Sequence, residues 1–152
     1  MKTLDPLNAL TLHQPWAWAV AEGFKAVENR DWRPGPAVLS VGAELAIHAG
    51  LQEPDPGDLE YVLERLPPGK LGRHLPRGGE LVRGCVVAVV RLETVVDSPF
   101  ALAPNQRPWW VGRYGWVLGQ VRRLERPVPC RGSQGVWRLP GEVLFQVREQ
   151  VG

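Results

Sequence analysis

A run of β-branched residues near the middle of the chain constrains the fold most. Within residues 84–96, the segment Cys85–Val90 reads Cys-Val-Val-Ala-Val-Val and contains no charged residue. β-Branched side chains favour strands, and a strand that is apolar on both faces is typical of the centre of a covered sheet. The sequence therefore predicts a central strand that is buried on both faces.

Further strands and a few short helices are predicted around this strand. Short apolar segments between turn residues indicate strands, and apolar residues at i, i+3 and i+4 indicate helices. The basic, glycine-rich segment 70–79 is expected to be a surface loop, for which phosphate contact is one option. The predicted strands are 9–12, 37–48 (with a break at Gly42), 114–124, 127–130 and 136–139, and the predicted helices are 15–23, 59–66 (capped by Asp58) and 142–150.

The composition predicts one globular domain that spans residues 1–152. Hydrophobic residues make up 44% of the chain, which is enough for a core, and there is no repeat or linker. No segment approaches the roughly 18 consecutive apolar residues of a membrane helix, and the N-terminus lacks a signal-peptide core, so we expect a cytoplasmic protein. Cys85 and Cys130 are expected to be free thiols, and the scattered His and Cys residues predict no metal site. No cofactor is predicted.

The stretch Leu12–Trp32 combines a short helix with an unusually polar strand. Pro15 suits the first turn of a helix, and Gly23 suits its end. The following segment, 25–32, has the length of a strand but carries charge on four of its eight positions. Buried charges require partners. Lys25, Glu28 and Arg30 therefore either satisfy one another in a structural network or line a cleft, and the seven tryptophans of the chain favour the cleft.

The charge of the chain is unevenly distributed although its net value is only +2. Residues 1–104 carry 10 basic and 13 acidic residues, whereas residues 105–152 carry 8 arginines and 3 glutamates. Arginine interleaved with aromatic residues suits phosphate contact and base stacking. The alternative, which has equal weight, is that arginine is simply the usual basic residue of this chain. Trp109 and Trp110 are expected on a strand, with one ring exposed as a stacking platform or a protein interface. The arginines concerned are Arg107, Arg113, Arg122, Arg123, Arg126, Arg131 and Arg138.

The sequence resembles the activating-signal-cointegrator homology (ASCH) family. The resemblance is carried first by His13-Gln14-Pro15-Trp16-Ala17 with the following Gly23-x-Lys25-x-x-Glu28-x-Arg30. It continues in order over about residues 10–140. The resemblance implies an α+β fold, a small PUA-like β-barrel with a few short peripheral helices, and an RNA-binding cleft. The later matching segments are Ile47-His48-Ala49, Gly84–Leu92, Tyr114-Gly115-Trp116 and Arg131–Leu139.

The first functional hypothesis is a module that binds RNA, another single-stranded nucleic acid or a modified nucleoside. Lysine and arginine would contact phosphate, a tryptophan ring would stack on a base, and Glu28 would accept hydrogen bonds from a base edge. His48 is weighed as either a structural histidine or a ligand contact. The candidate binding residues are His13, Gln14, Trp16, Lys25, Glu28, Arg30, Trp32, His48, Tyr114 and Trp116.

Two alternatives remain open from the sequence. The resemblance includes amidohydrolases that deacetylate a modified cytidine with a lysine, a threonine nucleophile and a glutamate. This chain has Lys25 but carries Glu28 where those relatives place threonine. In a hydrolase, Glu28 would act as a general base on water and Lys25 would stabilise negative charge, whereas RNA cleavage would involve His13 or His48. The second alternative is a structural or interaction domain in which the three charged residues only join the helix to the barrel.

Overall fold

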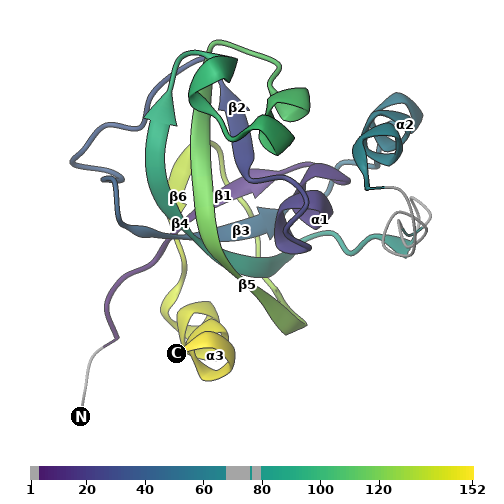
Figure 1. Cartoon of the computed structure of the whole chain (residues 1–152). Coiled ribbons are helices and arrows are strands. Elements are labelled where there is room, and N and C mark those ends of the chain that lie inside the picture. Colours follow the sequence, from purple (N-terminus) through teal and green to yellow (C-terminus); the bar gives the residue numbers. More distant parts are fainter. Residues whose placement is uncertain (1–3, 68–75, 77–79) are drawn as a thin grey trace.

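A computed structural model describes residues 4–67, 76 and 80–152 of the chain. Its core is a six-stranded sheet in the order β2-β5-β4-β3-β1-β6. The sheet curls into a half-barrel with short helices around it (Figure 1). The α+β fold that the sequence predicts, a small barrel-like sheet with short peripheral helices, is therefore confirmed. The strands are β1 (Asn8–Leu12), β2 (Val27–Arg30), β3 (Glu44–Ala49), β4 (Cys85–Val96), β5 (Tyr114–Pro129) and β6 (Val136–Arg138).

Strand β4 occupies the middle of the sheet, as its apolar sequence predicts. It pairs antiparallel with β3 on one side and with β5 on the other. All five residues of Val86–Val90 are buried. The other neighbouring strands are antiparallel too, except for β1, which runs parallel to β3. The parallel pair is possible because the chain passes through α1 and β2 between these two strands.

Two helices cover opposite faces of the sheet. Helix α1 (Trp16–Ala21) packs on β3, β4 and β5, and its Val20 belongs to a core cluster with Ile47. Helix α3 (Gly141–Val151) packs on β5, and its Val147 belongs to a second cluster with Ala46. Full burial of one such side chain contributes about 1.5–3 kcal/mol. Successive residues of β3 therefore point to different cores, which fixes the register of the strand.

The remaining helices lie beside α1 at one end of the half-barrel. Helix α2 (Pro56–Arg65) is capped by the side chain of Asp55, which accepts hydrogen bonds from the backbone of Gly57 and Asp58. The predicted cap at Asp58 is therefore wrong by three residues, because the helix begins at a proline that suits its first turn. Two 3₁₀ helices, η3 (Pro99–Ala101) and η4 (Pro104–Trp109), connect β4 to β5.

Two side-chain amides fasten the η4 segment to the residues just before β2 and to β2 itself. Gln106 accepts a hydrogen bond from the backbone of Ala26 at 2.8 Å and donates one to the carbonyl of Phe24 at 3.1 Å. Asn29 donates to the carbonyl of Trp109 at 2.9 Å and accepts from the backbone of Val111 at 3.0 Å. Each amide uses one donor and one acceptor, as a peptide group does. The η4 segment is therefore held against β2 without pairing with it as a strand.

Some predicted boundaries differ from the structure. The strand predicted at 37–48 is only β3 (Glu44–Ala49), because Gly42 adopts a positive φ of 92° and the residues before it form turns. The polar strand predicted at 25–32 is shortened to β2, and Lys25 lies before it. The edge piece predicted at 127–130 belongs to the long strand β5 as far as Pro129.

Two further expectations concern the surface and the membrane. The basic segment predicted to be a loop at 70–79 lies outside the described residues, except for Pro76. Among the helices of the described part of the chain, none has the length and apolar character needed to cross a bilayer.

Candidate functional site

A small pocket lies where β1, α1 and β2 meet. It has a volume of about 230 Å³ and is lined by Thr11, Leu12, His13, Trp16, Glu28 and Arg30. The two sequence segments that carry the family resemblance, 13–17 and 23–30, therefore come together at one place. A larger hollow of about 690 Å³ has Arg33 as its only charged residue among the described residues that line it. The other lining residues are Pro34, Gly35, Pro36, Leu39, Ser40, Val41, Leu92, Thr94 and Val95. Of these two hollows, the smaller one has more ionisable side chains in its lining.

A network of three charged side chains lies at this pocket, and two of its members, Glu28 and Arg30, line it. The two carboxylate oxygens of Glu28 are used separately: Oε1 lies 3.5 Å from the ammonium of Lys25, and Oε2 accepts a hydrogen bond from Arg30 Nε at 2.8 Å. Lys25 also donates to the carbonyl oxygen of Val27, and Arg30 Nη2 donates to the carbonyl oxygen of Thr11 at 3.3 Å. The network thus ties β2 to β1 and to the segment that follows α1.

The network has more cations than anions. With Lys25 protonated, two positive groups share the single carboxylate of Glu28. Lys25 is only 3% exposed, and this burial lowers the pKa of its ammonium, although the neighbouring Glu28 carboxylate acts in the opposite direction. An excess positive charge in a partly desolvated site favours a ligand that brings negative charge or hydrogen-bond acceptors.

The residues of the His13-Gln14-Pro15-Trp16 segment have different roles. His13 is exposed at the pocket, and Trp16 forms a wall whose ring lies 5.7 Å from the ammonium of Lys25. Gln14 is buried, accepts a hydrogen bond from the backbone of Trp18 at 2.9 Å and donates to the carbonyl of Val82 at 2.8 Å. Gln14 therefore holds the start of α1 and is not among the residues lining the pocket.

His48 does not join the pocket. Its ring is buried, with Nδ1 3.1 Å from the hydroxyl of Thr11 and Nε2 2.6 Å from the carbonyl oxygen of Cys130. Trp137 packs against it edge to face and donates its indole N–H to Thr11 Oγ1 at 3.1 Å. Burial lowers the pKa of His48, while the Cys130 carbonyl acts in the opposite direction. Both ring nitrogens are occupied by the protein, as expected of a structural histidine.

The three aromatic candidates beyond Trp16 also differ in exposure. Trp116 is fully buried in the core on the α1 side, so its ring is not available to a ligand. Trp32 is 36% exposed and meets Trp116 edge to face, with ring centres 5.0 Å apart. Tyr114 is partly exposed and lies between the guanidinium groups of Arg33 and Arg113. Of these three, Trp32 and Tyr114 could therefore contact a ligand directly.

The expected exposed ring of the Trp109-Trp110 pair is only partly found. Trp109 closes η4 and is buried, whereas Trp110 follows it and is partly buried. The prediction that these residues lie on a strand is wrong, because Pro104 and Pro108 favour a 3₁₀ segment over a ladder. A protein partner at this pair would have to bind Trp110 alone.

The arginines of the C-terminal third do not form one surface. Arg122 and Arg123 are neighbours on β5 and so point to opposite faces of the sheet. Arg122 pairs with Glu44, which also binds Arg148, and Arg123 pairs with Glu22 beside α1. These pairings serve the fold, and the charge bias of the sequence therefore does not locate a binding face.

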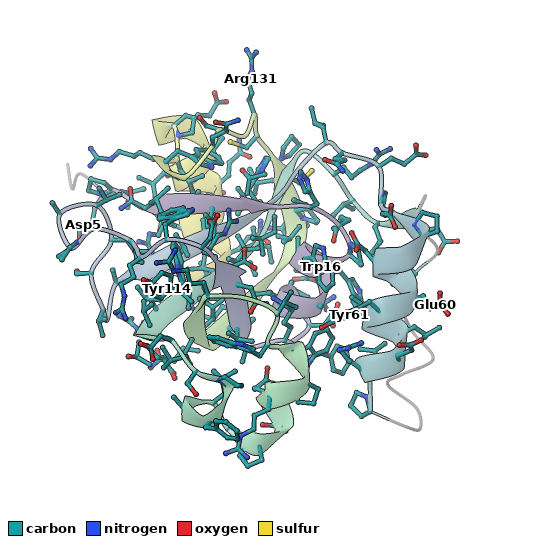
Figure 2. The ribbon with its side chains drawn as sticks, turned by 90° about the horizontal axis from the view of Figure 1, so that it is seen from above. Asp5, Trp16, Glu60, Tyr61, Tyr114 and Arg131 are labelled. Carbon is teal, nitrogen blue, oxygen red and sulfur yellow. The ribbon has the colours of Figure 1, made fainter. Side chains whose placement is uncertain are left out.

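Sequence reasoning missed several residues around the pocket. Thr11 and Leu12 line it from β1, although both read as ordinary strand residues. Tyr61 of α2 meets Trp16 edge to face, with ring centres 5.5 Å apart, and Figure 2 shows the two residues side by side. Arg65 stacks on Tyr61 at 3.2 Å from the ring centre. Helix α2 lies far from Trp16 in the sequence, and no short sequence motif predicts the contact between Trp16 and Tyr61.

Comparison with known proteins supports the fold. Solved structures of an ASCH protein from Zymomonas mobilis match with a TM-score of 0.54 at 16% sequence identity, covering 93% of this chain and 93% of that one. Two mutant forms of the same protein give TM-scores of 0.53 and 0.52 at 16% and 17% identity, each covering 93% of this chain and 96% and 94% of theirs. No protein-family model and no curated protein matches the sequence. The expected ASCH resemblance is thus confirmed at the level of the fold.

Proposed function

We propose that this chain, as one domain over residues 1–152, binds single-stranded RNA and holds one base in the pocket between β1, α1 and β2. The observation that carries the proposal is the network of Lys25, Glu28 and Arg30, which places two basic side chains around a single carboxylate beside the ring of Trp16. A purely structural network needs no pocket above it, whereas Glu28 and Arg30 line one.

The size of the pocket suits a base. Sites for drug-sized ligands usually have about 300–1,000 Å³, and this pocket has about 230 Å³. A single ring system with acceptor oxygens would fit, with the sugar and phosphate left outside. Arg30 offers hydrogen-bond donors to such oxygens, Lys25 supports the carboxylate of Glu28 from below the surface, and Trp16 offers an apolar wall.

The proposal is tested by titrating the protein with a six-nucleotide uridine oligomer and with its deoxy counterpart. Arg30→Gln should weaken RNA binding about tenfold or more, since charge-assisted hydrogen bonds are worth about 1.5–3 kcal/mol. Arg138→Gln, which removes an exposed arginine of β6, serves as the matched control. If Arg30→Gln lowers the melting temperature and leaves binding equal to that of the control, the network is structural and the proposal fails.

A second candidate function is hydrolysis of a modified nucleoside. The observation that favours it is the buried Lys25 with its lowered pKa, 3.5 Å from the carboxylate of Glu28. In that reaction Glu28 would activate a water molecule, and Lys25 would stabilise the oxyanion. The test is incubation with an N-acetylated cytidine and detection of released acetate, with Lys25→Met and Glu28→Gln as inactive references. Absence of product at high enzyme concentration removes this candidate.

A further inference from the structure

We propose that Arg33, Tyr114 and Arg113 form a phosphate clamp that binds the RNA backbone next to the base held in the pocket. This inference rests on the proposed function and adds a second site to it. The pocket is too small for a whole nucleotide, so the phosphate must be met elsewhere. We name these three residues the arginine–tyrosine cluster.

The cluster is built around the ring of Tyr114. The guanidinium of Arg33 lies 4.7 Å from the ring centre, and that of Arg113 lies 5.5 Å from it. Cation–π contact of this kind limits the freedom of a long side chain, so less entropy is lost when a ligand binds. Two guanidinium groups held by one ring present several N–H donors, which match the oxygens of a phosphodiester.

The cluster lies next to the pocket across a strand pairing. Tyr114 at the start of β5 is the direct partner of Arg30 at the end of β2. Partners in an antiparallel pair point to the same face, with Cβ atoms about 5 Å apart. Arg30 lines the pocket, so Tyr114 marks the next position along the same face. One nucleotide step could therefore lead from the pocket to the cluster.

The acidic groups near the cluster hold it only weakly. Asp97 lies 3.9 Å from Arg33, and the two side chains are 72% and 54% exposed. Exposed pairs of this kind contribute about 0–1 kcal/mol, so a phosphate can replace the carboxylate. Asp31 is the other acidic residue nearby in the sequence and is exposed. Among the residues that the structure describes, no ion pair involves Arg113.

The side of the pocket formed by Trp16 is less suited to RNA. Trp16 meets Tyr61 of α2, as Figure 2 shows, and Arg65 stacks on Tyr61. Arg65 already donates to the carbonyl oxygens of Pro108 at 2.8 Å and Tyr61 at 3.0 Å. Helix α2 also carries the carboxylates of Asp58, Glu60 and Glu64, which repel phosphate.

The experiment compares three probes of increasing phosphate content: uridine, the dinucleotide UpU and a six-nucleotide uridine oligomer. The double variant Arg33→Gln/Arg113→Gln should bind uridine as the wild type does and the oligomer about tenfold more weakly. The dependence of log K on log salt should flatten by about 0.7 for each phosphate that the variant no longer neutralises. Tyr114→Leu, which keeps both charges, should weaken oligomer binding in the same direction by freeing the arginines.

The matched control is Arg107→Gln/Arg138→Gln, which removes two exposed arginines outside the cluster. Equal oligomer affinity and equal salt slope in the two double variants would overturn the clamp. If the wild type still binds the oligomer through Arg30, the proposed function survives that result. If the wild type binds no single-stranded RNA, the clamp and the proposed function fall together. Unchanged melting temperatures verify that the variants are folded.

Discussion

Two buried polar networks lie on either side of strand β1, and they differ in how completely they are closed. On one face, His48, Thr11 and Trp137 bond to one another and to the Cys130 carbonyl. On the other face, Lys25, Glu28 and Arg30 form an ion network that opens into a pocket. Each network contains at least one residue that the sequence predicts as a site residue.

Thr11 takes part in both networks. Its carbonyl oxygen accepts a hydrogen bond from Arg30, and its hydroxyl meets His48 and Trp137. The difference between the two sides teaches that burial and hydrogen bonding alone do not mark a functional site. The closed network around His48 has no capacity left for a ligand, whereas the charged network retains excess charge and an opening. Substitutions on each side should therefore have different consequences.

The largest expected effect comes from breaking the charged network. Glu28→Ala leaves the buried ammonium of Lys25 without its carboxylate, and removal of one partner of a buried pair costs about 3–5 kcal/mol. The free energy of unfolding, from urea denaturation followed by tryptophan fluorescence, measures this loss. Glu64→Ala, on the exposed surface of α2, is the control and should change it by less than about 0.5 kcal/mol. A loss below about 1 kcal/mol would contradict the assignment of a buried ammonium at Lys25 and would fit a neutral amine there.

The closed network should give a smaller effect without any effect on binding. Thr11→Val keeps the shape of the side chain but leaves the indole N–H of Trp137 without its acceptor. An unsatisfied buried donor costs about 1–3 kcal/mol. Urea denaturation checks the loss. Titration with the uridine oligomer should give the wild-type affinity, because valine keeps the backbone carbonyl that Arg30 uses and the shape of the pocket wall at this position. Weakened RNA binding in this variant would show that the two networks are coupled through β1.

The two networks should also respond differently to acid. The pKa of His48 is lowered by burial, so the folded state binds fewer protons than the unfolded state between the folded pKa and 6.5. The stability contributed by neutral His48 is therefore complete above pH 6.5 and falls as the pH decreases toward the folded pKa. Thermal melts between pH 7 and 5 on the wild type and on His48→Gln check this. The variant should lose less stability over that interval, and identical slopes would contradict the assignment.

The smallest loss of stability is expected at an exposed ion pair, which serves as a reference for the buried charged network. Arg123 lies 3.1 Å from Glu22, and its side chain is 61% exposed. Arg123→Gln should lower the free energy of unfolding by less than about 1 kcal/mol, and the loss should shrink in 0.5 M salt. Urea denaturation at two salt concentrations is the measurement. A loss as large as that of Glu28→Ala would remove the distinction between buried and exposed pairs.

The sequence predicts those features of the molecule that are local in the chain. Strand β4 follows from an uninterrupted apolar run, and the end of α1 follows from Gly23, which adopts a positive φ of 82°. The charged network is also predictable because Lys25, Glu28 and Arg30 lie within six residues. Their mutual contacts require only a short turn and strand.

Long-range packing decides the features that the sequence does not predict. His48 reads like a site residue, but its ring nitrogens are bonded to partners that lie 37 and 82 residues away in the sequence. Trp116 and Tyr114 are two residues apart on β5, yet only the first is buried, because it lies deeper under α1. The arginine–tyrosine cluster joins residues 33 and 114 through a strand pairing that no local pattern reveals.

The hydrogen bond from Lys25 to the carbonyl of Val27 has a consequence for assembly. Strand β2 is an edge strand of the sheet, and edge strands can pair with a second chain and aggregate. The ammonium occupies a carbonyl that a foreign strand would otherwise use, and an inward-pointing charge is a common guard of such edges. The lysine of the charged network therefore also makes β2 a poorer template for another strand.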